Sequence, residues 1–465
     1  MNRTWLRLVG WALLGYALLV TSADGLVAPT SPALATLPPD ERCRLVLQRG
    51  IASGYRVVPG RWANVWYAVD PASPDATSPS FARRASAALD LGAEQLAAWS
   101  VRPAASGPGE RFQVCLVSLD RPGQTFTVRD PAEEPDGRAG GDAAEGWSFA
   151  LLSTTLATEP WERLVAVATH EYYHGVQCRY AACRALRDPS LAWLTEGSAE
   201  WAAVWVVGEP AYRQTYHNMA AALRAMEGGL TMSAAATRAR VVAAEPAYRG
   251  VLFFHFLADN VRVDFTGAGP AGVGRGLWEA LERTGDWRVA LSAVLATPPP
   301  GYERLDERLV AGSAVSLSSL DLAFLAFTEA HLFPTLWYPM RPPPLGAQCH
   351  EVALDETVVD LAVDDLEPYA ARCWRLRARP GALATVEVDG PAAPSPLLVA
   401  RVYSEGWYET AERAIVGLRR AGQFVHGAAG PVPAQGTVVL IARLGTASDG
   451  ASDGHTVRVA PAGRS

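Results

Sequence analysis

The stretch "VAVATHEYYHGVQC", residues 165 to 178, places two histidines four positions apart, with a glutamate directly after the first. Just upstream, Thr158 can cap a helix and Pro160 suits a first helical turn, so a helix is predicted to run through the stretch. Residues i and i+4 lie on one face of a helix. His170 and His174 can therefore offer two imidazole nitrogens to one metal ion.

The residue between these histidines and a second stretch complete the pattern of a catalytic site. Glu171 lies about a third of a turn away, where its carboxylate can act as a general base rather than as a ligand. A catalytic zinc ion has three protein ligands and an open position. A third histidine six residues after His174 would suit one class of site, but Tyr180 occupies that position. The amphipathic stretch "WLTEGSAEW", residues 193 to 201, instead offers Glu196.

Together, the two stretches resemble the gluzincin metallopeptidases, the clan of thermolysin and related aminopeptidases. Its members carry His-Glu-x-x-His on one helix and a glutamate ligand, in a Trp-Leu-x-Glu-Gly-x-Ala context, on a following helix. "HEYYH" and "WLTEGSAEW" match both, and the resemblance covers residues from about 145 to 260. It implies one zinc ion per chain, held by His170, His174 and Glu196, with Glu171 as the catalytic base. No subfamily is assigned, because the aminopeptidase motif that recognises a terminal amine is not visible.

Two supporting roles have candidate residues in the sequence. Glu200 lies one turn beyond the third ligand and can accept a hydrogen bond from the second nitrogen of a ligating histidine. The thermolysin-like branch has an acidic residue in this place, whereas the alternative is a solvated helix glutamate. The resemblance also implies a tyrosine or histidine that stabilises the oxyanion. The segment "PAYRGVLFFHFL" offers Tyr248, with His255 or neither residue as alternatives.

Ahead of the histidine stretch, strand and helix signals alternate. The ranges 61–69 and 111–119 have strand character, and 81–99 has helical spacing. The range 147–154 is another strand signal, which the resemblance matches to the edge strand along which gluzincins align peptides. Helical signals dominate residues 159–337. We therefore predict an α+β fold with a zincin-like catalytic lobe, which holds a mixed sheet and the active-site helix, and a helical second subdomain.

Composition divides the chain into segments. A Pro/Ala-rich lead at residues 24–40 precedes a gluzincin-like metallopeptidase domain at 41–337. A proline-rich linker follows at 338–348, where three consecutive prolines prevent a helix from continuing. Short β-rich runs separated by Gly, Pro and Asp turns fill residues 349–465. They predict a C-terminal all-β sandwich.

The N-terminus is typical of a signal peptide of 23 residues. Arg3 and Arg7 precede an apolar run from Leu8 to Val20, and small residues follow up to Ala23. The run is too short for a spanning helix. We expect cleavage near Ala23 and a secreted protein with no stable membrane insertion afterwards. The alternative is an uncleaved N-terminal helix that anchors the chain.

Six cysteines, an even number, fit an exported protein with disulfides. Their proximity in sequence pairs Cys178 with Cys183 and Cys349 with Cys373. That assignment leaves Cys43 to pair with Cys115. Some free buried thiols are the alternative, because connectivity does not follow from sequence alone.

Overall composition narrows the classes of function. Apolar residues make up 49% of the 465 residues, and the net charge is −7 without a dense basic patch, so we expect no nucleic-acid partner. A secreted zinc peptidase acting on peptides or proteins is the leading hypothesis. The alternatives are a zinc hydrolase for a non-peptide bond, and a non-enzymatic binding protein with a structural zinc lobe and a ligand-binding sandwich. Glu171 favours an enzyme, because a structural site needs no base. The oligomeric state is not predicted.

Overall fold

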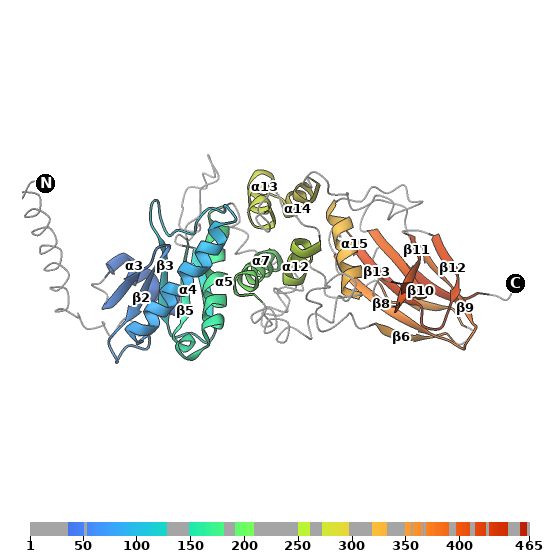
Figure 1. The fold of residues 1–465 in the computed structure, drawn as a ribbon, viewed down its shortest axis with the longest axis horizontal. Helices are drawn as coiled ribbons and strands as arrows, with labels where there is room; N and C mark the ends of the chain where they lie inside the picture. The colour runs from blue at the N-terminus through green and yellow to red at the C-terminus, as the bar shows by residue number, and fades with distance from the viewer. Residues whose placement is uncertain are drawn as a thin grey trace, which may run out of the picture.

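The computed structural model places strands at both ends of the chain and helices between them (Figure 1). This mixture of helix and sheet agrees with the predicted α+β class. The residues that the structure describes are 36–50, 54–127, 148–180, 191–208, 250–260, 272–296, 319–332, 349–354, 357–363, 366, 369–389, 397–409, 414–424, 427–444 and 456–462. The signal peptide and most of the Pro/Ala-rich lead, as well as the proline-rich linker, lie outside them.

A five-stranded mixed sheet forms the N-terminal part, in the order β1-β2-β3-β5-β4. Its central pairs β2–β3 and β3–β5 are parallel, and the outer pairs β1–β2 and β4–β5 are antiparallel. β2 and β3 fall where strands were predicted. The strands are β1 (Tyr55–Pro59), β2 (Ala63–Ala68), β3 (Phe112–Val117), β4 (Gly123–Thr127) and β5 (Ser148–Ser153).

The edge strand is not the one expected from the sequence. β5 was expected to form the edge, but it is hydrogen-bonded to β3 on one side and to β4 on the other, and all six of its residues are buried. Among the described strands, the edge position next to β5 belongs to β4. Its sequence, Gly-Gln-Thr-Phe-Thr, has only one large apolar residue, so it carries little strand signal.

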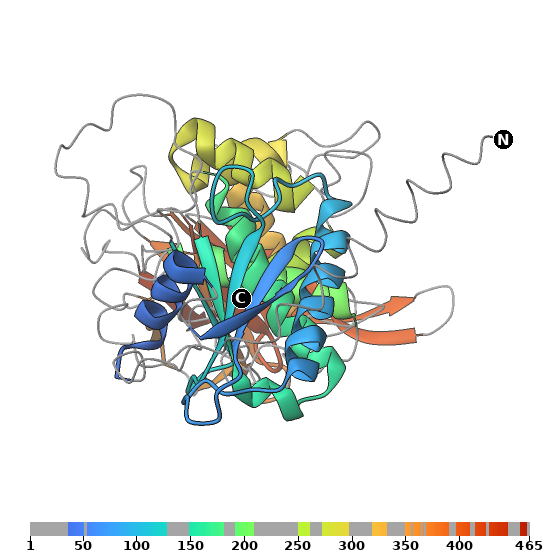
Figure 2. The same cartoon turned by 90° about the vertical axis from the view of Figure 1, so that its left-hand side faces the viewer.

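Helices cover both faces of this sheet (Figure 2). α3 (Pro39–Arg49) packs on one face, against side chains that include Cys115 and Leu151. α4 (Pro79–Ala97) and α5 (Trp161–Cys178) pack on the other, against Val114 and Leu152. Successive strand residues point to opposite faces, so one strand serves two apolar cores. α4 confirms the predicted helix, whereas α3 was not foreseen.

α5 begins after Pro160 and not at the expected cap. Thr158 ends a short 3-10 helix, η3 (Thr154–Thr158), in which its hydroxyl donates to the carbonyl oxygen of Thr155 at 3.2 Å. Pro160 has ψ 153°, an extended conformation, and α5 has no side-chain cap. The helix therefore starts at Trp161. The prediction that Thr158 caps this helix is wrong.

The helical middle continues from α5 onto α7 (Ala192–Val207) and α12 (Gly250–Asn260). α7 and α12 approach each other closely because glycines stand at the contact: a Cβ at Gly250 would lie 2.1 Å from the carbonyl oxygen of Trp193, and one at Gly197 would lie 2.7 Å from the Cα of Gly250. Beyond them are η6 (Gly272–Gly276), α13 (Leu277–Thr284), α14 (Trp287–Ala296) and α15 (Ser319–Leu332).

Two sheets form the C-terminal part, one of five strands and one of four, with a shared apolar core between them. The five-stranded order is β11-β10-β13-β8-β6, and the four-stranded order is β12-β9-β14-β7. The strands are β6 (His350–Ala353), β7 (Val359–Leu361), β8 (Ala370–Arg377), β9 (Leu383–Asp389), β10 (Leu397–Glu409), β11 (Ala414–Phe424), β12 (Gly427–Pro433), β13 (Val438–Leu444) and β14 (Thr456–Pro461).

The larger sheet also packs outward, against the helices. Tyr369 is central to this contact: its ring lies 5.5 Å from that of Phe324 and 6.0 Å from that of Trp287, and its hydroxyl donates to a carboxylate oxygen of Asp321 at 3.1 Å. Buried residues of β8 and β13 belong to the same apolar cluster as the helices. The C-terminal sheets are therefore fixed to the helical part by a packed interface.

Two of the predicted disulfides are confirmed. Cys43 of α3 is bonded to Cys115 of β3, and Cys349 is bonded to Cys373 of β8. Cys178 is also disulfide-bonded, whereas Cys183 lies outside the described residues. Disulfides of this kind persist in oxidising compartments. Among the described residues, none of the helices has the length and apolar character needed to cross a membrane.

Candidate metal centre

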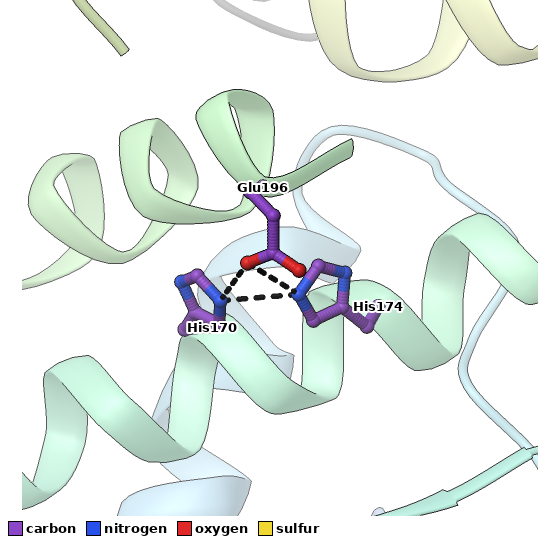
Figure 3. A group of neighbouring side chains, drawn as sticks. All are labelled: His170, His174 and Glu196. Atoms are coloured by element: carbon purple, nitrogen blue, oxygen red, sulfur yellow. Dashed lines mark hydrogen bonds and ion pairs between the residues drawn. The ribbon is translucent and has the colours of Figure 1, made fainter. Parts of the chain in front are cut away.

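Two imidazole donors come from α5. His170 and His174 are 8% and 4% exposed, because α5 lies between the N-terminal sheet and α7. Both side chains leave the same face of the helix, as their four-residue spacing dictates. Their Nε2 atoms point toward one another at a separation of 3.1 Å (Figure 3).

The third donor comes from α7. One carboxylate oxygen of Glu196, Oε2, lies 3.2 Å from Nε2 of His170 and 3.4 Å from Nε2 of His174. Within the described residues, these three form the one group of His, Cys, Asp or Glu side chains whose donor atoms converge in this way. Tetrahedral coordination at zinc–ligand distances of about 2.0–2.1 Å separates neighbouring donor atoms by about 3.3 Å. The three observed separations match that value.

The imidazole of His170 and the carboxylate of Glu196 shift each other's pKa values. Burial alone would lower the pKa of His170, but the hydrogen bonds that its ring nitrogens donate to the Glu196 and Glu200 carboxylates outweigh it and hold that pKa well above its usual value. Burial alone would raise the pKa of Glu196, but the charges and hydrogen bonds of the two histidines hold it well below its usual range. His170 and Glu196 thus stabilise each other's charged forms, and a metal ion that binds such a group displaces protons from its ligands.

Glu171 lies beside the donor group but is not one of its three members. The residue is 5% exposed and its carboxylate faces β4, where the hydroxyl of Thr125 donates to Oε2 at 2.7 Å and also lies 3.1 Å from the Glu171 carbonyl oxygen. Burial raises the pKa of this carboxyl group, against the charges of His170 and His174. A Cβ at Gly123 would lie 2.7 Å from Oε1, so any other residue at position 123 would displace the Glu171 carboxylate.

Outer partners orient both imidazoles. Oε2 of Glu200 lies 3.2 Å from Nδ1 of His170, so the structure places this glutamate at the site rather than in solvent. Nδ1 of His174 has a different partner, the side-chain oxygen of Gln177 at 2.8 Å. No role was assigned to Gln177 from the sequence. Its spacing of three residues from His174 on a helix was the available signal.

The oxyanion candidates lack support from the structure. Tyr248 lies outside the described residues. His255 lies in α12, where it is 2% exposed, and it is not part of the donor group. Thr125 was not foreseen, because β4 was not recognised as a strand and Thr125 is 46 residues before Glu171.

Comparison with known proteins adds no family assignment. No model of a known protein family matches the chain, and no curated protein matches it in sequence at a significant level. The motifs and the geometry of this site are therefore what indicates a function.

Proposed function

We propose that the protein is a secreted zinc-dependent peptidase of the gluzincin type. One observation carries the proposal: a buried carboxylate, Glu171, is held next to three converging donor atoms without being one of them. A structural zinc site is closed by four protein ligands, whereas a catalytic one has three and keeps a position open. The donors of His170, His174 and Glu196 number three among the described residues.

Two imidazole nitrogens and one carboxylate oxygen are a donor set typical of catalytic zinc. When bound, zinc would polarise the substrate carbonyl and lower the pKa of water. The remaining tasks belong to the protein. His170 and His174 present Nε2 because Glu200 and Gln177 engage their Nδ1 atoms.

Proton transfer is the task of Glu171. Thr125 fixes one carboxylate oxygen, Oε2, and the other, Oε1, lies toward Gly123 of the edge strand. We assign to Oε1 the acceptance of a proton from the attacking water and its delivery to the leaving amine. A raised pKa suits this exchange, because a general base works best when its pKa approaches the working pH.

The edge of β4 supports a peptide as the substrate. An extended peptide can add to an open sheet edge through backbone hydrogen bonds. β4 is the edge strand next to β5, and its residues Gly123 and Thr125 both border the Glu171 carboxylate. A peptide aligned on β4 would therefore pass beside the proposed base.

The binding-protein alternative has less support. Its ligand would need a receptive surface on the C-terminal sheets. One sheet face packs on the helices, and the space between the sheets is filled by their own apolar side chains. On the outer face of the smaller sheet, Arg458 pairs with Asp360 at 3.1 Å beside exposed Glu387, as on a solvated surface.

The test separates metal binding from catalysis at Glu171. Glu171→Gln keeps the shape of the side chain but cannot accept the proton. We expect about one zinc per chain in wild type and variant alike, with casein hydrolysis lowered about a hundredfold or more in the variant. Glu162→Gln, an exposed change in the first turn of the same helix, is the matched control and should retain full activity. Equal activity of Glu171→Gln and wild type would contradict the proposal.

A further inference from the structure

The side chain of Gln177 bridges the two helices that carry the metal donors. It is fully buried in the last turn of α5. Its Oε1 lies 2.8 Å from Nδ1 of His174. Its Nε2 lies 2.9 Å from the carbonyl oxygen of Thr195 and 2.9 Å from the hydroxyl oxygen of Ser198, both on α7.

The partners on α7 determine the positions of the oxygen and the nitrogen of the Gln177 side-chain amide. A backbone carbonyl only accepts hydrogen bonds, so the Thr195 oxygen requires the NH₂ end of Gln177. A hydroxyl has a single proton, and that of Ser198 is directed to the carbonyl oxygen of Leu194 at 2.6 Å. Toward Gln177, Ser198 therefore accepts as well. Two independent acceptors place the NH₂ group on α7 and the amide oxygen on His174.

This orientation in turn determines the tautomer of His174. An amide oxygen cannot donate, so Nδ1 of His174 must carry the proton and donate to it. In a neutral imidazole the other nitrogen then holds the lone pair. That nitrogen, Nε2, is the one that faces Nε2 of His170 and the Glu196 carboxylate.

We propose that Gln177 is a positioning residue of the metal centre: it holds His174 as the Nδ1–H tautomer and couples that tautomer to the turn of α7 that carries Glu196. Thr195 and Ser198 lie one residue before and two residues after Glu196. The same turn of α7 thus carries the third donor, Glu196, and holds the second donor, His174, through Gln177. The metal-binding part of this inference rests on the proposed function, whereas the tautomer can be measured without a metal.

The experiment uses the full secreted chain and two readouts. The zinc dissociation constant is measured by competition with a chelator. The tautomer of His174 is read from imidazole nitrogen shifts of metal-free protein labelled with ¹⁵N-histidine, recorded at a pH at which the His174 signal is that of a neutral imidazole; the chain has eight histidines. Gln177→Leu removes the amide at similar volume. Gln113→Leu is the matched control, because Gln113 of β3 accepts from the indole of Trp66 and lies outside the site.

We expect the Nδ1–H tautomer in wild type and its partial loss in Gln177→Leu, together with zinc binding about ten- to a hundredfold weaker. Gln113→Leu should match wild type in both readouts. Ser198→Ala is the milder second variant: it keeps the amide, removes one of its two acceptors and should weaken zinc binding about fivefold, as for one hydrogen bond. It decides the matter if Gln177→Leu does not fold.

The outcomes separate this inference from the proposed function. Wild-type zinc affinity and tautomer in Gln177→Leu, or wild-type affinity in Ser198→Ala where that variant decides, would overturn the positioning role and leave the zinc site standing. If the wild type binds no zinc, but Gln177→Leu loses the Nδ1–H tautomer that the wild type has, the peptidase proposal is overturned. The role of Gln177 in fixing the His174 tautomer is then supported.

Discussion

Glu196 and Glu200 lie one turn apart on α7, and the structure gives them different tasks. Glu196 contributes a donor atom within 3.4 Å of both Nε2 atoms, whereas Glu200 contacts the outer nitrogen of His170. We expect Glu196→Gln to lose stoichiometric zinc, because a neutral amide replaces one of three ligands. Glu200→Gln should retain zinc with an affinity about ten- to a hundredfold lower. Zinc content after dialysis against a graded chelator distinguishes the two, and identical losses would contradict the assignment.

Thr125 offers a test of how the proposed base is held. Thr125→Val removes the hydroxyl that donates to the Glu171 carboxylate but keeps the branched shape. A hydrogen bond to a charged group contributes about 1.5 kcal/mol or more, so we expect kcat to fall about tenfold with zinc content unchanged. Thr158→Val, outside the site, should match wild type. Steady-state hydrolysis of a fluorogenic peptide measures the difference, and an unchanged kcat would refute the orienting role.

The candidate site could be predicted from the sequence where its residues act locally. His170, Glu171 and His174 share one helical turn and its neighbour, and Glu196 stands in a recognisable context of its own. Thr125 could not be found, because its role depends on the pairing of a distant edge strand. Gln177 was visible as a helix neighbour of His174, but its partners on α7 come from tertiary packing.

The crossing of α7 and α12 sets the place of Glu196, the proposed third ligand. A Cβ at Gly250 would lie 2.1 Å from the carbonyl oxygen of Trp193, on the turn before Glu196, and backbone atoms cannot swing aside as side chains do. Gly250→Ala should therefore push the helices apart, lower the free energy of unfolding by about 2 kcal/mol or more and weaken zinc binding. Thermal unfolding with and without zinc measures both effects. A variant as stable as wild type would show that the contact is looser than described.

Helices and strands with a long apolar pattern in the sequence were easier to predict than short ones. α4 has 19 residues of helical spacing and was foreseen, whereas β4 has five residues and almost no apolar alternation. The start of α5 was misplaced because the extended backbone of Pro160 outweighs the capping tendency of Thr158. Local propensity therefore located the long helices, and tertiary pairing decided the short edge strand.

The two ends of the molecule are joined through Tyr369, which packs on α14 and α15. Tyr369→Ala removes an aromatic ring from this interface and should lower the free energy of unfolding by about 3 kcal/mol. Tyr369→Phe keeps the ring and loses only the hydrogen bond to Asp321, so its cost should be about 1 kcal/mol. Denaturant titration ranks the three proteins. Equal stability of all three would contradict a stabilising role of Tyr369 at this interface.

The proposed metal centre can be observed directly in a crystal of the protein purified with its own metal. An anomalous difference map at the zinc edge should show one peak per chain, about 2.0–2.2 Å from Nε2 of His170, Nε2 of His174 and a carboxylate oxygen of Glu196. The Glu171 carboxylate should stand outside this bonding distance. No peak at these residues, or a peak bonded to Glu171, would contradict the zinc site and the role of Glu171 as its base.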